Sequence, residues 1–232
     1  MSVPQVQLPL EVRLRAEATF DNFCEIDGAE PVIDALRRQP LAGGEPLLFL
    51  SGMSGAGKSH LLQACCHEQE AACLYLPLAD LVEYPAQDVL QATEHLQRLC
   101  CDDVHAVAGN EDWELGLFHL INRCRQSGCR LVFAAPAPPR TLAISLPDLA
   151  SRLAGGVVYP LPRPGDSEKT AILSFRAERL GLELSAPEAR FIVNRAPRKI
   201  EQLLDILDTL DRASLAQQRQ LSIPFIKSTL GW

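Results

Sequence analysis

The sequence has little positive charge for its 232 residues. Its 22 lysines and arginines stand against 29 aspartates and glutamates, and the formal net charge is −7. Proteins that hold nucleic acid directly usually present a basic face, because contacts between Lys or Arg and phosphates supply most of the affinity. We therefore expect protein partners and no direct, sequence-specific binding of DNA.

The sequence also lacks an apolar run of the roughly 18 to 20 residues that a membrane-spanning helix requires. Residues 1–18 contain no basic start followed by an apolar stretch, so they are not typical of a signal peptide. These two absences predict a cytoplasmic protein with no membrane partner.

The eight cysteines lack the C-x-x-C spacing that is typical of zinc sites. Two pairs, Cys65–Cys66 and Cys100–Cys101, are adjacent, and adjacent side chains on a helix or strand point in different directions. This pattern suits neither zinc nor a disulfide framework. We interpret the cysteines as small buried apolar side chains in a reducing compartment.

Short apolar runs alternate with helical patterns from Leu47 onward. The runs predict strands at residues 47–52, 71–78, 98–102 and 129–135, and the patterns between them predict helices at 58–70 and 110–127. Continuous apolar runs separated by helices are typical of a parallel sheet that is buried on both faces. The expected fold class is therefore α/β.

A proline-rich break at residues 159–168 ends this alternation, and only helical patterns follow. Asp166 or Ser167 can cap a helix that runs to about Arg179, and Ser185 with Glu188 fits a capping box. One further helix has its apolar positions on a single face: Ile200, Leu203, Leu204, Leu207 and Leu210. We expect a flexible tail at 1–16, an α/β base at 17–162 and a small helical lid at 163–232.

A complete phosphate-binding motif lies between the first expected strand and the helix after it. Its residues, Gly52-Met53-Ser54-Gly55-Ala56-Gly57-Lys58-Ser59, fit G-x-x-x-x-G-K-[ST]. The glycines let successive backbone N–H groups face one oxyanion, and the helix N-terminus adds its positive dipole end. Lys58 is predicted to reach the β- and γ-phosphates, and the Ser59 hydroxyl to bind Mg²⁺.

Two acids follow the apolar run at residues 98–101. A P-loop NTPase needs a carboxylate at the end of a neighbouring strand to order its metal. Asp102 ends the run and is predicted to hold Mg²⁺ through water, while Asp103 is placed to orient an attacking water.

The segments around these motifs resemble the DnaA/Hda family of AAA+ proteins over about residues 5 to 230. They are Ala18-Thr19-Phe20-Asp21-Asn22-Phe23, Asp102-Asp103-Val104 with Ala108-Gly109, Pro138-Pro139-Arg140, residues 146–153 and residues 221–227. The resemblance implies an AAA+ base and lid that bind ADP or ATP with Mg²⁺. It places the nucleotide against Phe20, Asp21, Asn22, Phe23, Gly52, Gly55, Ala56, Gly57, Lys58, Ser59, His60, Asp102, Asp103 and Arg198.

AAA+ subunits form nucleotide sites at their interfaces, where one subunit supplies an arginine to the ATP of the next. Arg152 matches the arginine finger of the family, and Arg198 matches its second sensor, which reaches the phosphates of its own nucleotide. Pro136 departs from the family pattern, since it stands where a polar first-sensor residue is expected. This departure argues against efficient hydrolysis by the chain's own site.

The leader is similar to the peptide with which Hda-type members of the family bind the bacterial sliding clamp. Gln5 would offer an amide to a polar pocket, and Leu8 and Leu10 would enter an apolar groove. Val6 departs from the usual leucine. No helix-turn-helix domain follows the lid, so a DNA-reading domain of the DnaA type is not expected.

The resemblance therefore implies a regulator of replication initiation, associated with the replisome and nucleoid. It would bind the DNA polymerase III sliding clamp and insert Arg152 into the ATP site of DnaA, which would then become inactive ADP-DnaA. Two alternatives stay open: an adaptor that recruits other replication or recombination proteins, and a stand-alone P-loop ATPase or kinase. Self-association as a homodimer is also left open.

Overall fold

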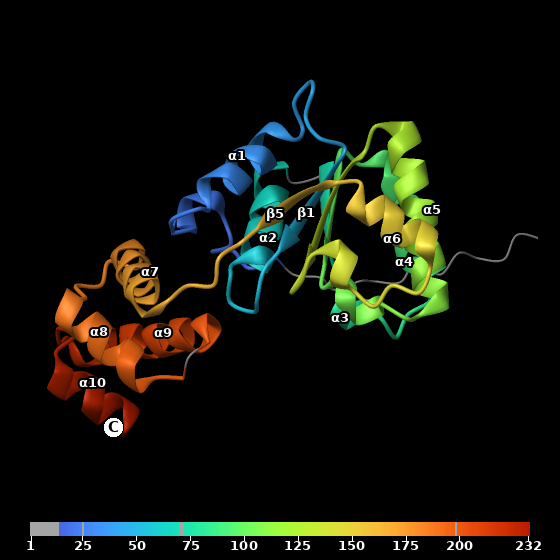
Figure 1. Cartoon of the computed structure of the whole chain (residues 1–232). Coiled ribbons are helices and arrows are strands. Elements are labelled where there is room, and N and C mark those ends of the chain that lie inside the picture. Colours follow the sequence, from blue (N-terminus) through green and yellow to red (C-terminus); the bar gives the residue numbers. More distant parts are fainter. Residues whose placement is uncertain (1–13, 25, 70–71, 198) are drawn as a thin grey trace, which may run out of the picture. The chain divides into compact units, whose positions relative to one another are not determined.

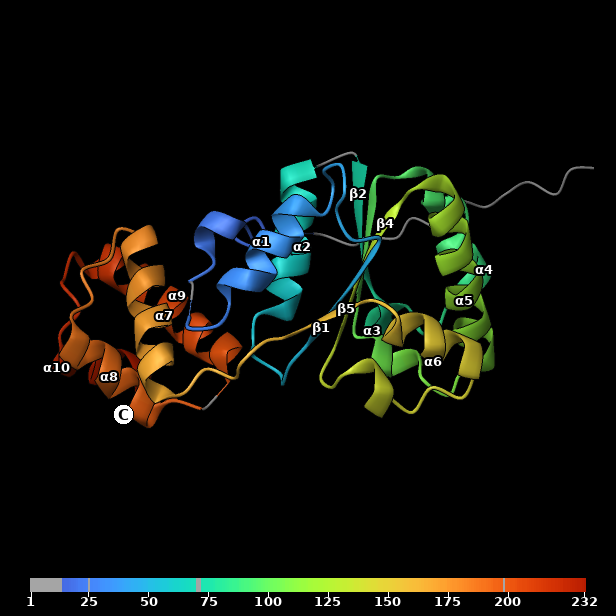
Figure 2. The same cartoon turned by 45° about the horizontal axis from the view of Figure 1, so that its top comes forward.

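The computed structural model describes residues 14–24, 26–69, 72–197 and 199–232. It contains two units (Figures 1 and 2). The first holds the α/β elements up to Pro162, and the second holds the helices from Arg163 to Trp232 together with short segments at Cys24, residues 26–27 and Ser54–Ala56. The observed architecture confirms the expected fold class, an α/β unit with a parallel sheet followed by a helical unit.

The α/β unit is built on a parallel sheet of five strands in the order β2-β3-β4-β1-β5. The strands are β1 (Leu47–Ser51), β2 (Cys73–Pro77), β3 (Arg98–Asp102), β4 (Arg130–Ala135) and β5 (Val157–Pro160). Every residue of β1 and β3 is buried. Their sequences are apolar without alternation because helices cover both faces of the sheet.

Helices cover both faces of the sheet (Figure 2). The first face carries α1 (Glu30–Arg38) and α2 (Lys58–Gln69). The second carries α3 (Leu78–Leu81), α4 (Ala86–Leu90), α5 (Glu111–Ser127) and α6 (Pro147–Ala154). Short 3-10 turns lie at Phe20–Asn22, Thr93–His95, Val104–Val107 and Pro139–Thr141.

The core of this unit lies on both faces of the sheet. Phe49, Phe133 and Trp113 belong to the cluster under α3–α6, whereas Leu48 and Leu61 are fully buried outside that cluster. Fully burying one such side chain contributes about 1.5–3 kcal/mol. The two apolar layers hold the loops at the carboxyl ends of the strands, where the phosphate-binding turn lies.

The predicted strands and the two predicted helices of this unit lie within a few residues of the observed ones. The Asn110 side chain accepts from the Trp113 N–H and so begins α5, and Gly128, at φ 84°, ends it. The sequence patterns missed β5, whose residues are only partly buried. Its last residue, Pro160, can occupy an edge strand because it has no N–H to contribute to a neighbour.

The helical unit consists of α7 (Asp166–Arg179), α8 (Ala186–Arg195), α9 (Ile200–Gln217) and α10 (Ile223–Leu230). Leu203, Leu207 and Leu210 of α9 are buried in its core, as the spacing predicts. The capping box at α8 is wrong in its details. Ser185 occupies the N-cap position, but its hydroxyl binds the Glu188 carboxylate and caps no backbone N–H.

No helix in the described ranges is both long enough and apolar enough to cross a bilayer.

Candidate functional site

The phosphate-binding turn joins the end of β1 at Ser51 to the start of α2 at Lys58. Gly55 and Gly57 have positive φ angles of 81° and 88°, a conformation that side chains rarely adopt. At Gly57 an added Cβ would also lie 2.6 Å from Cε2 of Phe23. Two constraints therefore require glycine at this position: the positive φ angle of the backbone and the Phe23 ring that packs against it.

Lys58 is buried at the first position of α2, and its side chain turns back over the loop. Its Nζ donates to the carbonyl oxygens of Gly52, at 2.7 Å, and Met53, at 3.2 Å. A buried ammonium held on backbone carbonyls costs little to transfer to a phosphate oxygen, which is a better acceptor. Ser59 follows it, half-buried, as the next residue of the helix.

Asp102 is fully buried at the carboxyl end of β3, and both of its carboxylate oxygens accept hydrogen bonds. Tyr75 on β2 donates its hydroxyl to Oδ2, and the backbone N–H of Asp103 donates to Oδ1, each at 2.9 Å. Burial raises the pKa of the Tyr75 hydroxyl, so it stays protonated and donating. Sequence reasoning missed Tyr75, because only the register of β2 against β3 brings it to Asp102.

Asp103 begins the loop after β3 in a left-handed conformation, at φ 54°. Burial raises the pKa of its carboxyl above the ordinary value, and the charge of Asp102 raises it further. The positive charge of Lys58 acts in the opposite direction. The structure thus brings the lysine of the turn and the two acids to one edge of the sheet, as an NTP site with Mg²⁺ requires.

The segment from Thr19 to Phe23 lies against the start of α2. A ring nitrogen of His60 is 2.7 Å from the Thr19 carbonyl oxygen, and the rings of His60 and Phe23 lie 5.5 Å apart at 60°. Phe20 is buried beneath the guanidinium of Arg37, which lies 5.0 Å from the ring centroid. Phe23 and His60 therefore lie together beside the phosphate-binding turn, Phe20 packs against α1, and Asp21 is exposed.

Pro136 follows the last residue of β4, at the same edge of the sheet as the turn. The carbonyl of Ala135 accepts the Gly52 N–H at 3.2 Å, which ties the end of β4 to the start of the turn. The residues at this end of β4 are Ala134, Ala135 and Pro136, whose side chains carry no polar group.

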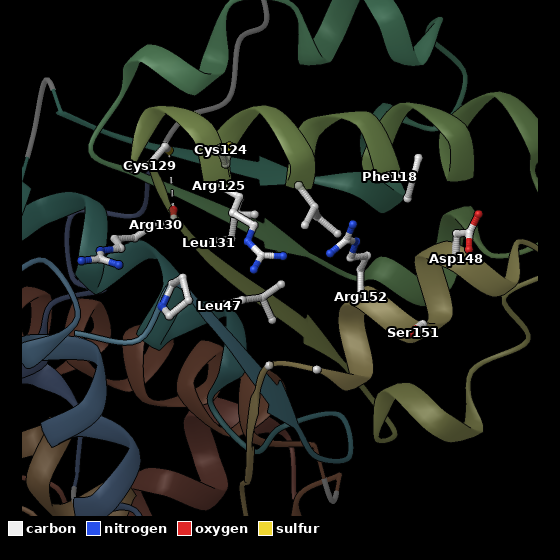
Figure 3. Close-up of a pocket in the computed structure, with 15 residues that line it drawn as sticks. Leu47, Phe118, Cys124, Arg125, Cys129, Arg130, Leu131, Asp148, Ser151 and Arg152 are labelled. Atoms are coloured by element: carbon white, nitrogen blue, oxygen red, sulfur yellow. Dashed lines mark hydrogen bonds between the residues drawn. The ribbon is translucent and has the colours of Figure 1, made fainter. Parts of the chain in front are cut away.

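Arg152 lies near the opposite ends of the strands, their amino ends. It belongs to the last turn of α6 and lines a cavity of about 600 Å³ together with Leu47 and Leu131, near the amino ends of β1 and β4. In Figure 3 the side chains of Arg152 and Arg125 project into the space between α5 and α6. Both are exposed, and within the described residues no ion pair joins either guanidinium to a carboxylate.

Glu114 on α5 fixes the loop that leads into α6, and sequence reasoning missed it. Its buried carboxylate accepts three backbone N–H groups: those of Gly109 at 2.6 Å, Ser145 at 2.9 Å and Leu146 at 2.7 Å. Leu146 is the N-cap residue of α6, so the negative charge also faces the positive end of that helix. Glu114 thereby holds the helix that presents Arg152.

The cysteines are free thiols, and seven of the eight are buried, as the composition predicts. Their spacing along the chain predicts no metal site, yet three of them lie close together in the structure. The sulfur atoms of Cys66, Cys73 and Cys100 all lie within 4.8 Å of one another. They come from α2, β2 and β3, so no short sequence motif could reveal the group.

Four predicted site residues lie outside the described residues. They are Gln5, Leu8 and Leu10 of the expected clamp-binding tail and Arg198 of the expected second sensor.

Two families match the sequence, one for each unit. Residues 14–160 match the bacterial DnaA ATPase domain, and residues 166–230 match the Hda lid domain. An uncharacterized protein of Haemophilus influenzae is 37% identical over 228 residues, which cover 97% of this chain and 98% of that protein.

The fold of this chain resembles solved structures of DnaA. Domain III of the replication initiation protein DnaA of Thermotoga maritima has a TM-score of 0.78 at 24% identity, with 94% of this chain and 98% of that one covered. AMPPCP-bound DnaA of Aquifex aeolicus has a TM-score of 0.70 at 20% identity, with 88% and 69% covered.

Proposed function

The chain belongs to the DnaA/Hda family of AAA+ proteins, and from this premise we propose that it regulates replication initiation by triggering the hydrolysis of DnaA-bound ATP. In this proposal the chain holds a nucleotide, docks on DnaA and lends Arg152 to the ATP site of its partner. The product is ADP-DnaA, which does not initiate again.

The nucleotide in the chain's own site is proposed to be ADP or ATP with Mg²⁺. Lys58 would bind the phosphates, Ser59 and Asp102 would hold the metal, partly through water, and Asp103 would lie beside it. Support comes from the buried Lys58, the left-handed glycines of the turn and the fully buried Asp102 on the neighbouring strand. When bound, Mg²⁺ neutralises charge on the phosphate oxygens.

Slow hydrolysis in this site is part of the proposal. A polar side chain at the end of β4 would place a water near the γ-phosphate, and Pro136 supplies none. The site would then serve to order the nucleotide-binding unit for docking.

The observation that carries the proposal is the position of Arg152. The cavity that it lines includes Leu47, the first residue of β1, whereas the phosphate-binding turn follows Ser51, the last. At about 3.3 Å per residue, these ends of the strand are about 13 Å apart. An exposed arginine near the end of β1 away from the phosphate-binding turn is suited to another protein's ATP, where such a residue contributes roughly 10³ to 10⁵ in rate.

A sliding clamp is the proposed tether. Gln5, Leu8 and Leu10 lie outside the described residues, so this step depends on the resemblance of the leader to the clamp-binding peptide. A tether raises the local concentration of the protein near DnaA without any new contact to DnaA itself. Inactivation would then depend on clamps loaded during replication.

The test is the ATPase activity of DnaA with this protein and a DNA-loaded clamp, each omitted in turn. Arg152→Ala is expected to lower the stimulation by about 10³-fold while ADP binding stays unchanged. Arg212→Ala removes an exposed arginine of α9 and is the matched control, expected to retain full stimulation. Full stimulation by the Arg152→Ala protein would instead favour an adaptor that recruits other proteins.

Two further measurements address the tether and the stand-alone enzyme. Replacing Gln5 and Leu8 together by Ala should abolish clamp pull-down and leave ADP binding intact. Phosphate transfer to a metabolite by the purified protein alone would contradict the proposal and support a P-loop kinase.

A further inference from the structure

Three buried thiols converge where α2 packs on β2 and β3. The Sγ atom of Cys66 lies 3.0 Å from that of Cys73, which lies 3.8 Å from that of Cys100. Cys66 is near the end of α2, Cys73 begins β2 and Cys100 is central in β3. The three are at most 8% exposed, so they are packed together by the tertiary structure and not gathered on a surface.

A fully buried arginine accompanies the thiols. Arg98 pairs with Cys73 in the β2–β3 register, and Cys100 is two positions further along β3, so all three side chains share one face of the sheet. Its Nη2 donates to the Leu36 carbonyl at 2.6 Å, but Nε and Nη1 have no hydrogen-bond partner among the described residues.

This arginine needs an anion. A guanidinium cannot lose its proton in a protein, and a buried charge without a counter-charge costs several kcal/mol. Protonated thiols do not supply the missing charge, whereas thiolates do. The electrostatic influence of Arg98 reaches both Cys66 and Cys73.

We propose that Cys66, Cys73 and Cys100 bind one thiophilic divalent metal ion, with the buried Arg98 as its charge-balancing neighbour. Three thiolates, a divalent ion and one guanidinium sum to zero net charge, which suits a fully buried site. Thiolates are the soft ligands that Zn²⁺ and softer ions prefer. Each thiol releases its proton to the solvent on binding.

The distances fit such an ion after a small adjustment. Metal–sulfur bonds of about 2.3 Å place neighbouring ligand sulfurs about 3.8 to 4.0 Å apart. The contact of 3.8 Å between Cys73 and Cys100 already has this separation, and the contact of 3.0 Å between Cys66 and Cys73 must widen by less than about 1 Å.

A disulfide between Cys66 and Cys73 is the competing chemistry for the short contact. It would join only two of the three thiols, and it is neutral, so the charge of Arg98 would remain without a partner. The metal site accounts for both the third thiol and the arginine.

The position of the site gives the ion a structural effect. Lys58 begins the helix that carries Cys66, and Asp102 lies two residues beyond Cys100 on the same face of β3. An ion would therefore fasten the helix of the phosphate-binding turn to the strand of the buried acid. Because it binds the folded chain, it should raise the melting temperature.

The test uses the full chain with Cys24→Ser, which removes the one cysteine that is not buried. The reduced, metal-free protein is titrated with Zn²⁺ against a chromophoric chelator, and with Cd²⁺ while the thiolate-to-metal absorption is recorded. One ion per chain is expected, with proton release and a rise in melting temperature. Cys66→Ser, Cys73→Ser and Cys100→Ser should each abolish this binding.

Cys124→Ser is the matched control, because Cys124 is equally buried but lies in the core cluster under α3–α6. It should still bind one ion. Arg98→Met tests the charge balance, and about a 10- to 100-fold weaker affinity is expected, as for other neighbours of metal ligands.

The titration of the Cys24→Ser protein needs no ligand variant to fold, so it decides the question alone if those variants are unstable. Absence of binding in that protein overturns the proposal, as does a Cys66–Cys73 disulfide that forms in place of ion binding. Equal binding by the ligand variants would overturn it as well.

Discussion

The carboxyl ends of the parallel strands, here called the carboxyl edge, differ from their amino ends, here called the amino edge. The difference is whether the charged groups have partners within the chain. At the carboxyl edge, Lys58 is held by two carbonyls and Asp102 by a hydroxyl and an N–H, so the charges are buried and partnered within the chain. At the amino edge, Arg152 and Arg125 are exposed and form no ion pair in the described part of the chain. Under the proposed function, the first edge holds the nucleotide and the second offers its exposed charge to DnaA.

In the proposed function, this difference separates nucleotide binding from the triggering of hydrolysis in the partner. Buried groups that are already held near the site can take up a phosphate with little reorganisation. An exposed guanidinium gains little until a second protein covers it and removes the water. The strand between the edges keeps the two tasks apart, so each should respond to its own substitutions.

The largest expected effect at the carboxyl edge is that of Lys58→Ala. Loss of a charge-assisted hydrogen bond worth about 1.5–3 kcal/mol should weaken ADP binding by about 10- to 100-fold. Calorimetric titration of ADP with Mg²⁺ measures it, with Lys227→Ala, an exposed lysine of α10, as the control. If Lys58→Ala bound ADP as tightly as the control, the carboxyl edge would not be a nucleotide site.

Glu114→Gln examines how the amino edge is held in place. The amide would keep an oxygen for some of the three N–H groups but turn an NH₂ toward another, so a loss of about 1–3 kcal/mol in unfolding free energy is expected. Urea denaturation measures the loss, and ADP affinity should change little. Glu111→Gln, an exposed change on the same helix, should alter stability by less than about 0.5 kcal/mol.

The smallest expected effect concerns Asp103 and pH. Because burial and then Asp102 raise its pKa in the folded state, the unfolded chain ionises first as pH rises above the ordinary value of 3.8. The native state therefore loses stability between that value and the folded-state pKa. Asp103→Asn should remove this loss, so its stability relative to the unsubstituted protein should rise across that window.

The free energies of unfolding of the Asp103→Asn protein and of the unsubstituted protein are compared by denaturation at several acid pH values. A stability difference that stays constant with pH would show that Asp103 titrates normally and that the acids of the carboxyl edge are not coupled.

The groups at the carboxyl edge were largely predictable because most of them are close in sequence. The glycine turn, Lys58 and Ser59 form one local motif. Asp102 ends an apolar run, and the apolar composition of that run indicates that the strand is buried on both faces. Likewise, the apolar spacing of α9 predicted its buried leucines, since helical periodicity is a local property.

The tertiary structure alone decided the contacts between elements distant along the chain. Tyr75 reaches Asp102 only through strand register, Glu114 reaches Leu146 only through the packing of α5 beside α6, and Cys66, Cys73 and Cys100 meet only where α2 covers the sheet. β5 was missed because its apolar run is only three residues long and leads directly into the proline-rich break. Sequence by itself determined the fold class and the phosphate-binding turn, because periodicity and glycine geometry act locally. Which charges are partnered and which are presented depended on side chains brought together from far apart.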